Sequence, residues 1–233
     1  MKISAFALPE IALGKHNVKN DRLDQADKLV HAKKKTYAQV ELAGQDASPE
    51  ADIIIIPKDA KMDLILGDLD FVETRLSKSP EEKEKIVLEK MKAALEKEEF
   101  ISSVGLSQQE KEVISGYGLL TLKPVVVIDQ AELVDLGILL ARVLAESAFI
   151  CFLTVGDKEN RAWLIKQGTT AWEAAGVIHS DIQQGFIRAE IISFADFISC
   201  GGETGAKQAG KMRLEQKEYI MQDADLVNFR FNK

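Results

Sequence analysis

The chain of 233 residues has few of the residues that disulfide-bonded or membrane proteins require. It contains two cysteines, Cys151 and Cys200, and both lie in apolar segments. The start, Met1-Lys2-Ile3-Ser4, has no cleavable hydrophobic segment, and no apolar run approaches the roughly 18 residues of a membrane span. The sequence therefore predicts a cytoplasmic protein with two free, buried thiols and no membrane contact.

Residues for catalytic chemistry are also scarce. The three histidines, His16, His31 and His179, are not at metal-ligand spacing, and neither cysteine has a neighbouring group that would activate it. The scattered serines form no nucleophile motif. The sequence thus predicts no metal site and no catalytic residues, and an enzymatic activity would depend on nucleotide motifs alone.

Basic residues are in deficit only in the middle of the chain. The formal net charge is −7. Residues 1–60 carry 9 basic and 9 acidic side chains, residues 61–160 carry 12 and 19, and residues 161–233 carry 9 and 9. A negative chain is not a general nucleic-acid binder, so contact with RNA requires a local basic face.

The last third has the pattern of a small α+β domain. Period-2 apolar runs predict strands, and Thr169-Thr170 before an apolar segment predict a helix N-cap. The order is that of a β-grasp sheet with a helix packed on one face. The expected elements are strands over 150–155, 161–165, 188–193 and 226–231, and helices over 171–177 and 194–200.

Many short groups of residues in this stretch occur in the order and spacing of one known family. Because they extend over about seventy residues, the last third resembles the C-terminal TGS domain of the YchF/Obg-like ATPases. The resemblance implies contacts with RNA and the ribosome, although Gln216 and Ala224 replace turn glycines of the family. The matching groups are Arg161-Ala162-Trp163, Ile178-His179, Gly185-Phe186-Ile187-Arg188-Ala189-Glu190, Gly201-Gly202-Glu203, Gly205-Ala206-Lys207, Gly210-Lys211 and Phe229-Arg230-Phe231-Asn232.

Residues 1–148 resemble a degenerate form of the nucleotide-binding domain of the same family. After a strand expected over residues 1–8, Gly14-Lys15 match the phosphate-binding loop, but His16 replaces the hydroxyl residue that would hold Mg²⁺. Residues 21–44 resemble the family segment that leads into the second nucleotide-binding motif. The first helix and the first switch region, which the family has before this segment, are missing from this sequence. The alternative is a plain loop that binds no phosphate. The nucleotide-binding candidates are Gly14, Lys15, Glu41, Gly44 and Asp129.

Hydrolysis of a nucleotide requires the phosphate cradle, the lysine, the Mg²⁺ ligands and a water-positioning group together. Glu41-Leu42-Ala43-Gly44 stand where the family has Asp-Ile-Ala-Gly, and Asp129-Gln130-Ala131-Glu132 stand where it has the base-reading Asn-x-x-Glu. We therefore expect weak or absent hydrolysis and no required cofactor. The alternative is residual binding of ATP or GTP with Mg²⁺ through Lys15.

The acidic middle predicts a helical hairpin at about residues 62–100. Apolar residues recur at three- and four-residue steps over 64–76 and again over 87–95, and Ser79-Pro80 would begin the second helix with Ser79 as its N-cap. The family has a coiled-coil insertion here. After the hairpin, residues 125–128 predict a strand buried on both faces. The hairpin is expected to bind a protein partner or to present a solvated face.

The RNA-binding candidates surround a glycine-rich stretch, residues 201–210, whose exposed backbone would approach a phosphate chain. Acidic residues are interspersed, so a mixed-charge surface is the alternative. The candidates are Arg188, Lys207, Lys211, Arg213 and Lys217.

Together these patterns predict a two-part α/β protein. Residues 1–148 would form an abbreviated P-loop-like α/β domain with the helical hairpin, and residues 149–233 a β-grasp, ubiquitin-like TGS domain. The predicted function is a non-hydrolysing module that binds the ribosome or RNA. The alternatives are a regulator that binds ATP or GTP and a protein-interaction adaptor that uses the hairpin. A homodimer that covers an unpaired sheet edge is also compatible with the sequence.

Overall fold

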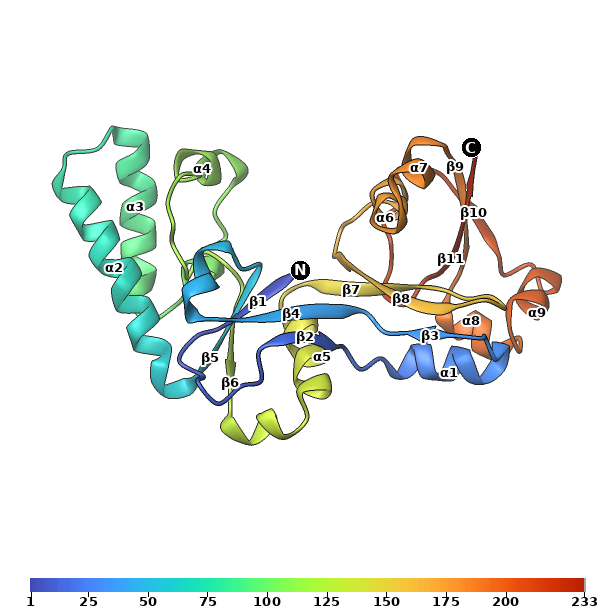
Figure 1. Ribbon diagram of the computed structural model, residues 1–233. Coiled ribbons are helices and arrows are strands. Elements are labelled where there is room, and N and C mark those ends of the chain that lie inside the picture. The colour runs from blue at the N-terminus through green and yellow to red at the C-terminus, as the bar shows by residue number, and fades with distance from the viewer. Residues whose placement is uncertain (233) are drawn as a thin grey trace. The chain divides into compact units, whose positions relative to one another are not determined.

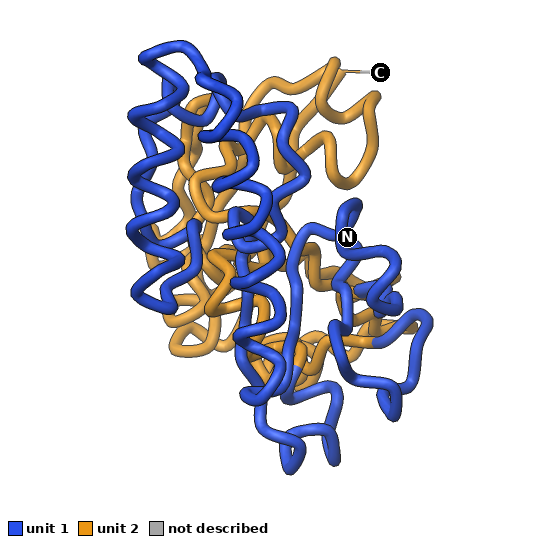
Figure 2. Tube along the Cα trace, turned by 90° about the vertical axis from the view of Figure 1, so that its left-hand side faces the viewer, with its two compact units in different colours: residues 1–16, 40–139 blue, residues 17–39, 140–233 orange. Residues whose placement is uncertain are grey.

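The computed structural model describes residues 1–232 and contains two compact units (Figure 2). Unit 1 consists of Met1–His16 and Val40–Leu139, and unit 2 consists of Asn17–Gln39 and the described residues from Leu140 onward. Residues 17–39 and 140–148 therefore group with the C-terminal part of the chain, although the sequence places them in the first domain. The boundary predicted near residue 148, between the P-loop-like domain and the TGS domain, stays a prediction. No helix within residues 1–232 is long and apolar enough to cross a membrane.

The first sheet has five strands in the order β2-β4-β1-β5-β6. Strand β1 runs parallel to β4 and β5, and β5 runs parallel to β6. Four consecutive isoleucines in β5 are fully buried, because this strand lies inside a parallel sheet that is covered on both faces. The strands are β1 (Lys2–Ala5), β2 (Gly14–Asn17), β4 (Gln39–Gly44), β5 (Ile53–Pro57) and β6 (Val125–Ile128).

The prediction that β6 is buried on both faces was wrong. The apolar run Val125–Ile128 was expected to be buried on both faces, but β6 is an edge strand and only alternate residues, Val126 and Ile128, are buried. The doubly buried strand is β5, whose isoleucines give the same sequence pattern. An apolar run alone does not separate an edge strand from a central one.

The predicted helical hairpin is present in unit 1 as α2 (Lys61–Ser77) and α3 (Glu82–Leu95), which lie side by side (Figure 1). Their apolar faces meet in a cluster that includes Val72, Leu88 and Met91. Ser79 is not the N-cap of α3, as the sequence predicted. It has a positive φ of 51° in the connecting turn, and the helix begins after Glu81. Further helical elements are η1 (Gln45–Glu50), η2 (Lys58–Ala60), η3 (Ile101–Val104), α4 (Gln108–Val113), η4 (Gln130–Val134) and α5 (Leu136–Glu146).

The second sheet belongs to unit 2 and has six strands in the order β10-β9-β11-β7-β8-β3. Strands β7 and β8 form the expected antiparallel hairpin, β11 lies parallel to β7, and β9 lies antiparallel to β11. All four strands predicted in this part are confirmed, whereas the short strands β3 and β10 were not anticipated. The bounds are β3 (Lys35–Thr36), β7 (Phe149–Thr154), β8 (Asn160–Lys166), β9 (Phe186–Ile192), β10 (Arg213–Glu215) and β11 (Leu226–Phe231).

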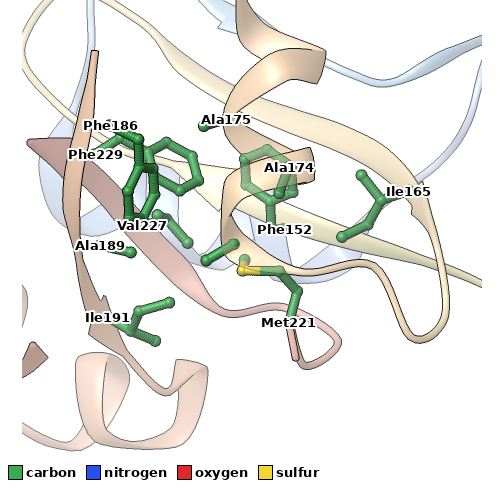
Figure 3. Packing of buried hydrophobic residues seen from close by; sticks show 11 residues of the cluster. Phe152, Ile165, Ala174, Ala175, Phe186, Ala189, Ile191, Met221, Val227 and Phe229 are labelled. Carbon is green, nitrogen blue, oxygen red and sulfur yellow. The ribbon is translucent and has the colours of Figure 1, made fainter. Parts of the chain in front are cut away.

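One face of this sheet packs against helix α6 (Ala171–Ile178) (Figure 3). The side chains of Phe152, Phe186 and Phe229 meet Ala174 and Ala175 of the helix in a continuous apolar cluster. The predicted N-cap is confirmed, because the Thr170 hydroxyl accepts a hydrogen bond from Glu173 N–H and the Glu173 carboxylate accepts one from Thr170 N–H. The helix α7 (Ser180–Gln184) follows.

The other face of the sheet is covered by α1 (Asp21–Val30), α8 (Phe194–Ser199) and α9 (Glu203–Gln208) (Figure 1). Leu23 and Ala26 of α1 are fully buried against Leu153 and Ala162 of the β7–β8 hairpin. The buried Asn160 side chain donates a 2.7 Å hydrogen bond to the Asp27 carboxylate. The segment 17–39 is therefore part of the core of unit 2.

Replacing Leu23 with alanine is expected to destabilise unit 2 by about 2–4 kcal/mol, because the removed atoms leave a cavity between α1 and the sheet. Leu29 on the same helix is 43% exposed, so Leu29→Ala is the matched control and should change the unfolding free energy by less than about 0.5 kcal/mol. Both tryptophans, Trp163 and Trp172, lie in unit 2, so urea unfolding followed by tryptophan fluorescence measures this unit. Equal losses for the two variants would contradict the packing described.

Candidate functional site

The lysine of the predicted phosphate loop lies in a strand. Gly14 and Lys15 open β2, an exposed edge strand beside β4, and the next helix along the chain, α1, belongs to unit 2. Gly14 has a φ of 115°, which only glycine adopts easily. His16, at the position of the Mg²⁺-binding hydroxyl, uses its ring nitrogen Nε2 for a 2.7 Å hydrogen bond with the Ala12 carbonyl.

The other nucleotide-binding candidates are spread over the first sheet. Gly44 ends β4 near Leu13, but Glu41 lies three residues earlier at the level of Lys2, about 10 Å away along the strand. Asp129 follows β6, which is three strands from β4 and therefore about 14 Å across the sheet. The structure brings Gly14 and Gly44 close to one end of β4 and does not bring Asp129 to them.

The residues around these candidates already have structural partners. The Glu132 carboxylate accepts a 2.8 Å hydrogen bond from Asp129 N–H, so this pair closes the start of η4. Lys123 donates hydrogen bonds of 2.6 to 2.9 Å to the carbonyls of Ser48, Pro49 and Ala51 at the end of η1. Burial lowers the pKa of Lys123. Within residues 1–232, no group of three or more histidine, cysteine, aspartate or glutamate side chains is arranged to hold a metal ion.

Both cysteines are free, as predicted, but each is half-buried rather than fully buried. Burial raises the pKa of the Cys151 thiol to about 12, so this thiol is not an activated nucleophile. His179 has the structural role expected of it, because its Nδ1 accepts a 3.1 Å hydrogen bond from Asp181 N–H at the start of α7.

Three of the five RNA-binding candidates are paired with acidic side chains. Lys207 lies 2.5 Å from Glu203, Lys211 lies 3.4 Å from Asp196, and Arg213 lies 3.4 Å from Glu215. Arg188 and Lys217 form no ion pair with the residues that the structure describes. The alternative of a mixed-charge surface therefore fits the region around Lys211 and Arg213.

The glycine-rich stretch is not an exposed loop. Its centre, Glu203–Gln208, is helix α9, and a Cβ on Gly205 would approach the Cys200 carbonyl oxygen to 2.0 Å. The glycines therefore allow close packing and the turn into the helix. Ala224 keeps the left-handed turn, with a φ of 62°, where the family resemblance places a glycine. Its N–H donates a 2.7 Å hydrogen bond to the Cys151 carbonyl.

A buried carboxylate that sequence reasoning missed lies on the face of the β9–β11 pair away from α6. Glu190 is 4% exposed, and its two oxygens accept hydrogen bonds from Arg230 and, at 2.7 Å, from Asn228 Nδ2. Burial by itself raises the pKa of Glu190, but the hydrogen bonds from Arg230 and Asn228 outweigh it, so the pKa lies below its usual range. In the sequence, an acidic residue within the apolar run of β9 was the one sign that a buried carboxylate lies there.

Comparison with known proteins assigns the chain to a family. The family model for the YchF GTPase C-terminal region, described as a protein of unknown function (DUF933), matches residues 149–232. The ribosome-binding ATPase YchF of Pasteurella multocida is 36% identical over 255 residues, which cover 83% of this chain and 69% of that protein. The chain belongs to the YchF family.

Other relatives agree with this assignment. The ribosome-binding ATPase YchF of Haemophilus influenzae is 37% identical over 232 residues, which cover 73% of this chain. The chain spans 64% of the length of that relative. The structure of the Schizosaccharomyces pombe YchF GTPase superimposes with a TM-score of 0.80 over 99% of this chain and 97% of the other, at 18% identity. At that identity the likeness shows that the YchF fold is shared, with its mixed α/β architecture.

Replacing Arg230 with alanine in this YchF-family chain is expected to destabilise unit 2 by about 1–2 kcal/mol at pH 7, because a buried carboxylate loses its cation but Arg230 is itself largely solvated. The loss should shrink as the pH falls. In the unmodified chain the stabilisation by ionised Glu190 is complete above about pH 4.3 and is lost as the pH falls through the lowered pKa. In the variant, burial without Arg230 raises the pKa, so stability is lost as the pH rises through it.

Urea unfolding at pH 7 and at about pH 4, followed by tryptophan fluorescence, measures this effect. Lys158→Ala, which removes an exposed cation from the β7–β8 turn, is the matched control. A loss in the Arg230 variant that is the same at both pH values would show that Glu190 does not depend on Arg230.

Proposed function

We propose that this YchF-family chain is a non-hydrolysing module that associates with the ribosome or with RNA in the cytoplasm. The relatives that it matches over most of its length are named ribosome-binding ATPases. The family match to the C-terminal region, residues 149–232, supports unit 2 as the part that makes the contact.

We also propose that the C-terminal part of unit 2 is a β-grasp domain of the TGS type. The antiparallel β7–β8 hairpin, the helix α6 on one face and the returning strand β11 beside β7 support this assignment. The strand order from β10 to β8 places the two terminal elements of the domain next to each other in the middle of the sheet.

The position of Lys15 is the observation that carries the non-hydrolysing part of the proposal. A phosphate-binding loop presents its lysine and backbone N–H groups at the start of a helix, where the helix dipole also favours the phosphate. In this chain Lys15 lies within edge strand β2, and the ring of His16 is bonded to Ala12. His16 supplies no hydroxyl for Mg²⁺, and Asp129 follows β6, which lies about 14 Å across the sheet from β4.

Calorimetric titration of the chain with ATP and with GTP, each with and without Mg²⁺, tests this part. We expect no saturable binding up to about millimolar nucleotide, because an isolated surface lysine supplies little binding free energy. Saturable binding that is lost in Lys15→Ala but kept in Lys78→Ala, a control lysine in the hairpin turn, would contradict the proposal. The chain would then be a nucleotide-binding regulator.

One observation favours an adaptor as the second candidate function. The groove between α3 and α4 exposes Ile86 and Val113 by 47% and 40%, and Lys83, Gln109 and Glu112 line it. Exposed aliphatic side chains with a charged rim are common in protein interaction sites. This surface lies on the hairpin of unit 1, so it can be tested separately from unit 2.

Co-sedimentation with purified ribosomes over a range of salt concentrations separates the two candidates. The double substitution Lys207→Glu with Lys211→Glu is expected to weaken association about tenfold or more, and the remaining binding should be less sensitive to salt. The matched control, Lys78→Glu with Lys97→Glu, makes the same charge change on the hairpin. Loss of binding in Ile86→Glu with Val113→Glu, which changes the groove between α3 and α4, but not in the Lys207 and Lys211 variant would favour the adaptor. Absence of ribosome binding by the unmodified chain would overturn the proposed function.

A further inference from the structure

The pairing of β9 with β11 places two arginines next to each other on the second sheet, just before a β-bulge. The pairing of β9 with β11 shifts between Arg230, which pairs with Arg188, and Phe231, which pairs with Phe186. Ile187 is therefore the extra residue of β9. Residues directly opposite each other share a face of the sheet, so Arg188 and Arg230 both lie on the face away from α6, and the bulge at Ile187 returns Phe186 to the α6 cluster that also contains Ala189.

The two arginines are an unfavourable pair for the fold alone. Like charges directly opposite each other on neighbouring strands are destabilising. Arg188 is exposed and makes no ion pair within residues 1–232, and the Arg230 side chain is 61% exposed. Local arrangements that are unfavourable for folding, such as this pair of like charges, tend to occur at functional sites.

The buried Glu190 fixes one of these cations in place. Its two oxygens are already used by Arg230 and Asn228, so it orients the Arg230 guanidinium and has no free oxygen directed at Arg188. Arg188 therefore stays available to an anion from outside the chain. The guanidinium of Arg230 is thus held by Glu190, and the guanidinium of Arg188 beside it forms no ion pair with residues 1–232.

Lys207 adds a third positive charge to this group. Its ammonium, paired with Glu203, is close enough to Glu190 and Arg230 for both to influence its pKa. The three cations and the two acids, Glu190 and Glu203, leave a net charge of about +1 at neutral pH. A single small anion would gain little from that charge, whereas a polyanion that bridges several cations would gain more.

We infer that Arg188 and Arg230, with Lys207 beside them, form a contact site for the phosphate backbone of RNA. Guanidinium groups bind phosphate oxygens in a two-pronged geometry, which a lysine does not reproduce. The site contacts backbone rather than bases, so its binding is independent of sequence. This inference rests on the proposed association with the ribosome and names the surface that makes it.

The test uses the full chain and a fluorescein-labelled single-stranded RNA of mixed sequence, about 30 nucleotides long, in a fluorescence anisotropy titration. Arg188→Ala is expected to weaken binding about three- to tenfold at about 100 mM salt and to reduce the slope of log K against log salt by about 0.7. Arg188→Lys should recover the salt slope but only part of the affinity. Lys158→Ala, the matched control on the same unit, should bind like the unmodified chain.

The Arg188 side chain forms no ion pair with residues 1–232 and faces a like charge, so Arg188→Ala should unfold at the same or a slightly higher urea concentration than the unmodified protein, and a loss of binding will not reflect a loss of folding. Unchanged RNA binding in Arg188→Ala would overturn the inference. So would ribosome binding without any binding of free RNA, which would point to a protein contact. Either result leaves the proposed function standing, whereas absence of ribosome binding by the unmodified chain overturns both.

Discussion

The fold of unit 2 depends on the burial of helix α1 against the second face of its sheet. Leu23 and Ala26 close an apolar face that Leu153 and Ala162 would otherwise present to water. Strand β3 extends the same sheet beside β8, and the carboxylate of Asp27 satisfies the buried amide of Asn160. A segment near the start of the chain is therefore part of the core that the last third builds.

The packing of α1 in unit 2 also determines the conformation of the residues around Lys15. A phosphate-binding loop needs a helix directly after its lysine, packed on the same sheet as the preceding strand. In this chain the first helix after Lys15 is α1, and its apolar side is committed to unit 2. The residues around Lys15 have taken an extended edge-strand conformation instead. The extended conformation around Lys15 and the packing of α1 in unit 2 are two consequences of one arrangement of the chain.

Much of unit 2 could be predicted from the sequence, because its signals are local. The alternating runs predicted the four long strands, and Thr169-Thr170 marked the start of α6. Strands β3 and β10 have only two and three residues, too few for a periodic pattern. Helix α1 was not predicted, and neither was the sheet against which it packs, because an amphipathic segment does not encode its partner.

The candidate site was predicted in part for a related reason. Arg188 and Lys207 were found because they are basic residues in a matched stretch. Arg230 was missed, because its importance comes from the register of β11 against β9, which pairs it with Arg188. The buried Glu190 joins residues 40 positions apart, a distance at which sequence patterns carry no information about contacts.

Native-state hydrogen exchange measured at increasing urea concentration tests the central claim most directly, because it gives an opening free energy for each segment. If α1 completes the core of unit 2, the amides of α1, β7 and β8 will open together with the same free energy. Exchange of α1 at a much lower free energy, with β7 and β8 still protected, would show that the helix is a loosely attached covering and would contradict the claim.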